Sequence, residues 1–394
     1  MPTNNLSNSL TSSEPFSKLD RWSLAFDGTN DYVTMGNVLN LGTGDFTIAF
    51  WAKNDNWGSA ENNYFISKYE DTNNRWYVRL KNDDPPRLQM YTKIGGTDSG
   101  KNMFFGDNTV GPSFDDMNGQ WVHICISSDR DGLNKGYINN TLNDSDSGTA
   151  ATMDNDGPLE IAKHDSTEFG GNISEVVIYN KALSASEVGT IYNGGDGYRH
   201  DTGVCSANLV GWWRMGDGPL DRFDDNGLIC DNATTPSIGA NLVTNGDFAD
   251  ATSTDSSSSA LAGWTNGGDH TGAGQRVTIS SGQATMVCDG TDIRLQQTIL
   301  TSGKIYKYSI DIISNDGAGG TAIRLETGAG TEIKTLATGG TTYTGYFVAD
   351  NTVIRIRRTG ACNVTFDNVV IQEVSGNPGI MVNMAADDFE EDSP

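Results

Sequence analysis

The sequence has few prolines, few basic residues and no long apolar run. Among 394 residues there are only 10 Pro, and 26 Lys and Arg stand against 51 Asp and Glu, giving a formal net charge of −25. Such an acidic surface repels nucleic acid phosphates and anionic membranes, so we expect no nucleic acid or membrane partner. No stretch approaches the roughly 18 apolar residues that span a bilayer. The N-terminal segment lacks a basic region followed by an apolar one, so we expect no secretory signal.

Cysteine and histidine are also scarce. The five cysteines form no C-x-x-C pair, which predicts free thiols in a protein made in a reducing cytosol, although Cys205 and Cys230 could form a bridge. The four histidines lie in unrelated contexts, and there is no G-x-S-x-G motif. No predicted strand carries the two carboxylates that glycoside hydrolysis requires. We therefore predict that the protein is not an enzyme and has no catalytic residues.

Glycine is abundant, with 47 residues, and it separates many short segments in which apolar and polar residues alternate. This pattern is typical of β-strands joined by tight turns. One segment differs: after Lys181, Ser184 and Glu187 have the spacing of a helical capping box. We predict an all-β fold of two β-sandwich (jelly-roll) domains in tandem, with an extended N-terminal arm and a C-terminal tail.

The alternating segments divide the chain into five parts. NLVGWWRM, within the third part, reads as an added strand that packs on the first domain. Residues near both ends are polar or acidic, so by composition they would fray unless a partner surface or a neighbouring subunit holds them. The predicted parts are an anchoring arm (1–20), a first sandwich (21–198), a linker with the added strand (199–240), a second sandwich (241–375) and an acidic tail (376–394).

Four motifs in the first sandwich occur in an informative order. They are SLAFDGTNDYVTMG, DFTIAFWAK, WVHICISS and GGNISEVVIYNKALSASEVGTIYNGG. In this order they resemble the laminin-G-like, concanavalin-type lectin family over residues 22–195. The resemblance implies a lectin fold in which calcium could bind Asp27 and the residue at position 174. That residue is Ser174, where the family usually has Asp, which argues against calcium in this domain.

The second sandwich opens with NLVTNGDF, contains Gly263–Trp264 and closes with NVTFDNVVIQEV. These features resemble the carbohydrate-binding modules found beside bacterial xylanases and cellulases. The resemblance implies a structural Ca²⁺ that joins the first and last strands through Asp247 and Asp367. The alternative is that both carboxylates only accept hydrogen bonds from turn amides.

Glycan binding needs exposed aromatic rings that stack on sugars. Trp57 lies in the polar loop NDNWGSAENN and is the leading candidate, followed by Trp76 in the next strand and by Tyr343 and Tyr346 in the second sandwich. Strand aromatics more often belong to a core, and Trp264 is expected to be structural.

The order of the two modules, followed by an acidic tail, resembles virion surface proteins of tailed bacteriophages, especially marine ones. The resemblance implies a fibre-like adhesin or a capsid decoration protein on the virion surface, with cell-surface glycans as ligands. Its arm and tail would bind other virion proteins, and a homo-oligomer, with a trimer favoured, would be expected. Two alternatives stay open: a structural spacer that has lost sugar binding, and a secreted bacterial glycan-binding protein.

Overall fold

The computed structural model describes most of the chain beyond the N-terminal segment, so the predicted arm (1–20) lies outside the described residues. The described residues are 21–394 without 58–62, 82–85, 98–102, 106–113, 149–150, 219–220, 222–226, 235–236, 251, 273, 290, 316–322 and 359–360.

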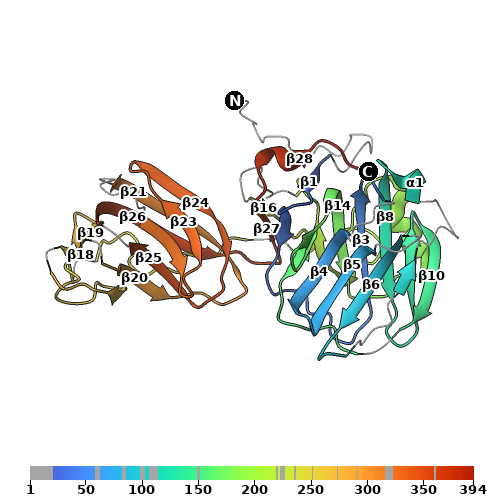
Figure 1. The fold of residues 1–394 in the computed structure, drawn as a ribbon, viewed down its shortest axis with the longest axis horizontal. Coiled ribbons are helices and arrows are strands. Elements are labelled where there is room, and N and C mark those ends of the chain that lie inside the picture. Colours follow the sequence, from blue (N-terminus) through green and yellow to red (C-terminus); the bar gives the residue numbers. More distant parts are fainter. Residues whose placement is uncertain are drawn as a thin grey trace.

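The N-terminal part forms a sandwich of two antiparallel sheets (Figure 1). The back sheet has the order β10-β9-β8-β3-β14-β1-β28, with β15 also paired to β14. Its strands are β1 (Ser23–Asp27), β3 (Phe46–Lys53), β8 (Trp121–Ser128), β9 (Leu133–Ile138), β10 (Thr141–Ser147), β14 (Gly170–Tyr179), β15 (Leu209–Trp213) and β28 (Phe389–Glu390).

The front sheet has the order β16-β27-β2-β11-β4-β5-β6-β7, and the short pair β12–β13 lies beside β4. Its strands, with that pair, are β2 (Tyr32–Thr34), β4 (Asn63–Asp71), β5 (Asn74–Lys81), β6 (Arg87–Lys93), β7 (Met103–Phe105), β11 (Leu159–Ile161), β12 (Lys163–His164), β13 (Thr167–Glu168), β16 (Leu228–Ile229) and β27 (Gly379–Val382).

Alternation along the strands builds the core of this sandwich. Ile48 and Phe50 of β3 face Phe65 of β4 and the other buried side chains between the two sheets. The outer face of the back sheet is covered by α2 (Ala185–Tyr192), whose Val188 and Ile191 pack on that sheet. The predicted capping box is confirmed, because Ser184 and Glu187 satisfy each other's backbone N–H groups. A second short helix, α1 (Phe114–Met117), precedes β8.

Residues after Asn241 form a second sandwich of two five-stranded sheets. Their orders are β17-β20-β25-β22-β23 and β18-β19-β26-β21-β24. Trp264 is buried and stacks on Phe248, which agrees with the structural role predicted for it. The strands are β17 (Thr265–Gly268), β18 (Gln275–Ser280), β19 (Gln283–Asp289), β20 (Ile293–Thr298), β21 (Ile305–Asn315), β22 (Ile323–Thr327), β23 (Glu332–Leu336), β24 (Thr341–Val348), β25 (Val353–Arg358) and β26 (Ala361–Glu373).

The second sandwich is inserted into the first rather than following it. β16 and β27 flank it in sequence and pair with each other in the front sheet of the first sandwich, and β28 pairs with β1 (Figure 1). The C-terminal residues, expected as a separate tail, are therefore part of the first domain. Met381 and Phe389 enter its core, because apolar side chains among the acidic ones find a place between the two sheets.

A small apolar cluster joins the two sandwiches. Leu228, Cys230 and Ile380 from the first pack against Ile305 and Val374 at the base of the second. The two connecting segments also bond to each other, since the backbone N–H of residue 375 donates to the carbonyl of residue 237. The inserted domain is thus held by two adjacent crossings of the chain and by direct packing.

The fold class is confirmed, because the described residues are almost entirely strands and turns. All five cysteines are free thiols, so the alternative of a bridge between Cys205 and Cys230 is wrong. The Cys205 thiol instead donates to Glu187. Among the described residues, no helix has the length and apolar character needed to cross a membrane.

Candidate functional site

The two tryptophans predicted to stack on sugars are not exposed. Trp57 and Trp76 are both 0% exposed and belong to the core of the first sandwich. Trp57 reaches the core because the backbone of its polar loop turns inward: its N–H donates to Asn118, and its ring lies 5.8 Å from that of Phe65. The expectation that Trp57 is exposed in its loop is therefore wrong, and in this conformation neither ring is available to a ligand.

The two tyrosines proposed in the second sandwich are half-buried. The Tyr343 hydroxyl accepts a hydrogen bond from the backbone N–H of Thr338, and its ring packs on the core of that sandwich. Tyr346 packs against the apolar cluster between the sandwiches. The structure therefore does not bring the four predicted aromatics together, and their role in binding stays a prediction.

A different set of aromatics gathers on the outer face of the front sheet. Trp76 and Val78 of β5, and Leu88 and Met90 of β6, point into the core, so the alternate residues face outward. No described helix covers this face, in contrast to the back sheet under α2, although Tyr64 and Tyr77 on it are only 8% and 5% exposed. We name it the tyrosine–arginine face: Tyr64, Tyr69, Arg75, Tyr77, Arg79, Gln89, Tyr91, Lys93 and His164.

The rings on this face are ordered by mutual contacts. Tyr77 and Tyr91 stack at 5.0 Å, and Tyr64 stacks on His164 at 4.5 Å. The guanidinium of Arg79 lies over Tyr64 and Tyr77 and donates to the Tyr64 hydroxyl, while that of Arg75 lies over Tyr91. Such contacts fix the side chains before any ligand arrives, which lowers the entropic cost of binding.

The electrostatics of this face are positive. Burial, followed by the charges of Arg75 and Arg79, lowers the pKa of His164 to about 4, so its ring is neutral at pH 7. His164 is 6% exposed. Among the described residues, neither its Nε2 atom nor the buried Nε atom of Arg75 has a hydrogen-bond partner. Unsatisfied buried polar atoms are uncommon in folded proteins and are a frequent feature of binding sites.

Beyond β4, β11 carries one acidic side chain on the same side of the front sheet. Glu160 lies between the core residues Leu159 and Ile161 and is opposite Ser67 of β4. Burial raises its pKa to about 7, while Lys163 lowers and Glu168 raises that pKa to smaller extents. Glu160 is thus only partly charged near neutral pH.

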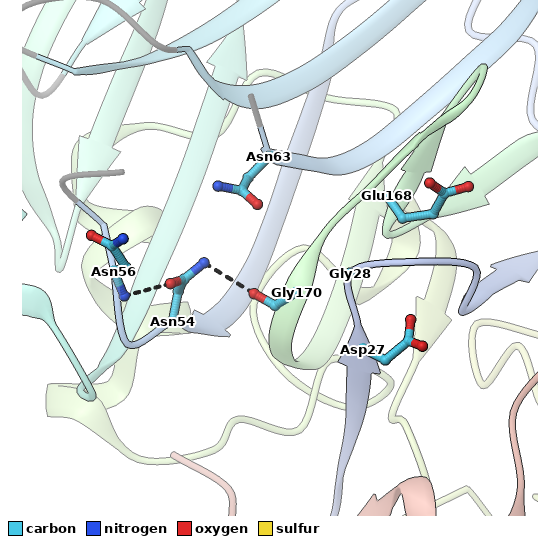
Figure 2. Close-up of a pocket in the computed structure, with 7 residues that line it drawn as sticks. All are labelled: Asp27, Gly28, Asn54, Asn56, Asn63, Glu168 and Gly170. Atoms are coloured by element: carbon cyan, nitrogen blue, oxygen red, sulfur yellow. Dashed lines mark hydrogen bonds between the residues drawn. The ribbon is translucent and has the colours of Figure 1, made fainter. Parts of the chain in front are cut away.

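A polar cleft of about 260 Å³ adjoins the tyrosine–arginine face at the start of β4. Figure 2 shows the amides of Asn54 and Asn56 on one side and the carboxylates of Asp27 and Glu168 on the other, with Asn63 at the rim. The Asn54 side chain donates to the carbonyl of Gly170 and accepts from the Asn56 backbone. None of the described residues that line the cleft is aromatic, so it suits a small polar ligand better than the flat side of a sugar ring.

Asp27 and Ser174 do not form a common site. The β1–β14 register puts Asp27 opposite Gly170, four residues from Ser174, which is roughly 13 Å along a strand. The Ser174 hydroxyl donates to the carbonyl of Trp22. Asp27 Oδ1 accepts three backbone N–H groups of its own turn, and although desolvation opposes them, these donors hold the Asp27 pKa below its usual value. The expectation that Asp27 and the residue at position 174 lie together at one calcium site is therefore wrong.

In the second sandwich, Asp247 and Asp367 do lie near each other, together with a third carboxylate. Desolvation, followed by the charges of Asp311 and Asp247, raises the pKa of Asp367. Asp311 is the register partner of Asp367 between β21 and β26. Sequence reasoning missed Asp311 because only strand pairing brings it to this place. Asp247 and Asp367 each accept a backbone N–H of their own turn, from Ala249 and Asn368, as the alternative expected. Calcium at this place stays a prediction.

One further acidic group lies at an end of the first sandwich. Carboxylate oxygens of Asp45, Asp129 and Asp131 come within 4.8 Å of one another. Asp45 Oδ1 accepts the backbone N–H of Arg130, so Asp45 stabilises the turn that follows β8.

The geometry is that of a β-sandwich domain with a tyrosine–arginine face on its front sheet, and known families are similar to it in sequence. Residues 27–189 match the family model Laminin_G_3, described as the concanavalin A-like lectin/glucanases superfamily. The first sandwich is therefore similar to concanavalin A-like domains over this segment, which is less than half of the chain.

Among individual proteins, the chain is similar to botulinum neurotoxin type E of Clostridium butyricum, with 27% identity over 173 residues. The match covers 42% of this chain and 13% of the toxin, so the chain spans only a small part of this curated relative.

Solved structures are similar at low identity and with TM-scores below 0.4. A putative carbohydrate binding protein from Bacteroides ovatus matches at 16% identity and a TM-score of 0.39, covering 54% of this chain and 56% of that one. Full-length tailspike protein 2 of an Escherichia coli O157:H7 bacteriophage matches at 14% identity and a TM-score of 0.36, covering 53% and 31%. The binding domain of botulinum neurotoxin serotype D matches at 13% identity and a TM-score of 0.35, covering 92% and 87%.

Proposed function

We propose that this protein is a non-catalytic, glycan-binding protein of a bacteriophage virion, and that the tyrosine–arginine face is its binding surface. The observation that supports binding is the ordered array of aromatic and basic side chains on the outer face of the front sheet, where Tyr91 is half-buried and Tyr77, 5% exposed, stacks beneath it. Tyrosine rings with a polar edge can pack on the apolar side of a sugar while their hydroxyls form hydrogen bonds.

The absence of catalysis is part of this proposal. Glycoside hydrolysis uses two carboxylates that flank one bond. Fold alone does not decide activity, so an assay on the polymers that bind is required: release of reducing sugar would contradict this part of the proposal.

The virion role rests on the resemblance of the module order to tailed-phage surface proteins. We propose that the protein is located at the virion surface, either on a fibre or on the capsid, and forms a homo-oligomer, with a trimer favoured. Residues 1–20 are the proposed contact to other virion proteins. The C-terminal segment is less suited to that role than the sequence suggested, because β27 and β28 are already paired within the first sandwich.

A glycan array with the full chain tests the binding surface. Tyr91→Ala removes a half-buried ring from the face, and Tyr192→Ala is the matched control, because it removes a half-buried ring at the end of α2 on the opposite sheet. We expect the first variant to lose at least tenfold in affinity and the control to bind like the wild type. Binding that ignores Tyr91 would contradict the assignment of the surface.

The virion role has its own test, which does not depend on sugar binding. Antibody against residues 22–195 is applied to intact particles from the source and examined by electron cryo-microscopy. Label on capsid or tail supports the proposal and separates a decoration protein from a fibre. Protein that is found free or on cells, and on no particle, contradicts it.

A structural spacer is the second candidate function. The complete burial of Trp57 and Trp76 favours it, because the two leading aromatics then serve only the core. A spacer should be present on particles and bind nothing on the array.

A further inference from the structure

The proposed binding surface is rich in basic side chains, although the chain as a whole is acidic. Although the formal net charge is −25, the outward positions of β5 and β6 hold only basic, amide and tyrosine side chains. They pair in rows across the two strands: Arg75 with Lys93, Tyr77 with Tyr91, Arg79 with Gln89, and Lys81 with Arg87.

Two of these rows bring like charges directly opposite each other. Arg75 faces Lys93, and Lys81 faces Arg87. Such cross-strand pairs destabilise a sheet compared with opposite or neutral pairs. Residues that lower stability without a structural benefit are often retained for function, because binding sites trade stability for a ligand.

One acidic group beside the face is Asp71 at the end of β4, whose charge interacts with that of Arg75. Its Oδ1 also accepts the backbone N–H groups of Asn73 and Asn74. Glu160 and Glu168 belong to the far side of β4. The guanidinium of Arg79 is held in place by Gln89 and the Tyr64 hydroxyl, so its position is fixed.

We propose that the ligand of this face is an acidic saccharide, whose anionic group is bound at Arg75 and Lys93 and whose ring packs against Tyr91. This inference rests on the proposed function, since it specifies the class of sugar for the same surface. An arginine and a lysine on adjacent strands can hold one carboxylate or sulfate through charge-assisted hydrogen bonds. The neighbouring aromatic ring supplies apolar contact at the same place, because Arg75 itself lies over Tyr91.

Binding of the full chain to three polymers at 0.15 M salt tests the proposal: polygalacturonate, which carries carboxylates, dextran sulfate, which carries sulfates, and neutral dextran. We expect at least one acidic polymer to bind and neutral dextran to bind at least tenfold more weakly. The preferred acidic polymer distinguishes carboxylate from sulfate. Equal or tighter binding of neutral dextran overturns the acidic class of ligand but leaves glycan binding intact. A glycan array that shows binding to neutral sugars only leads to the same conclusion.

The double variant Arg75→Gln/Lys93→Gln should lower affinity for the acidic polymer at least tenfold. The matched control is Lys304→Gln/Arg324→Gln in the second sandwich, which removes the same charge from two exposed residues. An equal loss in both variants would mean non-specific attraction and would overturn the site. Unchanged thermal unfolding of both variants excludes misfolding as the cause. If no polymer binds and the glycan array is also empty, the proposed function falls together with this inference.

Discussion

The two sandwiches of this protein are built from the chain in opposite ways. The first is closed by strands from distant parts of the sequence: β1 pairs with β28, and β2 pairs with β27. The second is made from one continuous segment, residues 241–375, with β26 as its central strand between β19 and β21. The first sandwich therefore depends on the C-terminal segment for its closure, whereas all strands of the second sandwich lie within one continuous segment of the chain.

The sandwiches also differ in what their surfaces offer. The first covers one outer face with α2, while no described helix lies on the tyrosine–arginine face. In the second, the group of chemical interest is the carboxylate cluster of Asp247, Asp311 and Asp367. A positive, aromatic surface and an acidic cluster are thus kept on separate domains.

Removing residues 376–394 should destabilise the first sandwich far more than the second. The truncation deletes β27 and β28 and takes Met381, Met384 and Phe389 out of the core. Burial of each such side chain contributes about 1.5–3 kcal/mol, so the first sandwich should lose about 5 kcal/mol or more. Differential scanning calorimetry should show the loss of one unfolding transition while that of the second sandwich remains. Two intact transitions would contradict the closure described for the first sandwich.

The pH dependence should also differ between the sandwiches. The folded-state pKa of Glu160 is raised to about 7 from 4.5, so its protonated form stabilises the fold at low pH and this stability is lost as the pH rises from about 4.5 to 7. Glu160→Gln should therefore gain up to about 3 kcal/mol over the wild type across that window. Denaturant unfolding at several pH values measures the difference. A constant difference, or one matched by the exposed control Glu373→Gln, would contradict the assignment.

Calcium should act on the second sandwich alone. Occupancy of a site at Asp247 and Asp367 with Ca²⁺ at 100 times its dissociation constant would stabilise that domain by about 2.7 kcal/mol. Without calcium, Asp367→Asn should raise its unfolding temperature, because the variant removes repulsion from Asp311 and Asp247. With calcium, the same variant should lower it relative to the wild type. A variant effect of the same sign in both conditions would exclude the site, and the transition of the first sandwich serves as the internal control.

A substitution at the contact between the sandwiches should change stability less than the changes described above. Gly36 has a φ of +70°, and a Cβ there would come within 2.4 Å of the carbonyl oxygen of Gly303 in the second sandwich. Gly42, with a φ of +60°, has open space around the same position and is the matched control. Both Ala variants carry the strain of a positive φ, about 1–2 kcal/mol. Only Gly36→Ala should also loosen the junction, which limited proteolysis near residues 237 and 375 would detect. Equal cleavage of the two variants would contradict a tight junction.

Much of the fold could be predicted because it depends on local pattern. Alternation identified the strands, and the spacing of Ser184 and Glu187 identified the capped helix α2. The motifs around Phe26 and Ile48 indicated the similarity to concanavalin A-like domains that the comparison also finds. The aromatic site residues could not be predicted, because a polar loop sequence does not reveal that its backbone turns inward and buries Trp57.

The sequence by itself determined the all-β class, the two sandwiches and the acidic character of the chain, since periodicity, turn residues and charge are local properties. Tertiary structure alone decided that the second sandwich is inserted into the first and that Met381 and Phe389 complete a distant core. It also decided that Arg75 and Lys93 face each other beside Tyr91, and that Asp311 joins Asp367. These relations depend on which strands pair and in which register, and pairing between distant segments is set by the free energy of the whole core rather than by any one segment.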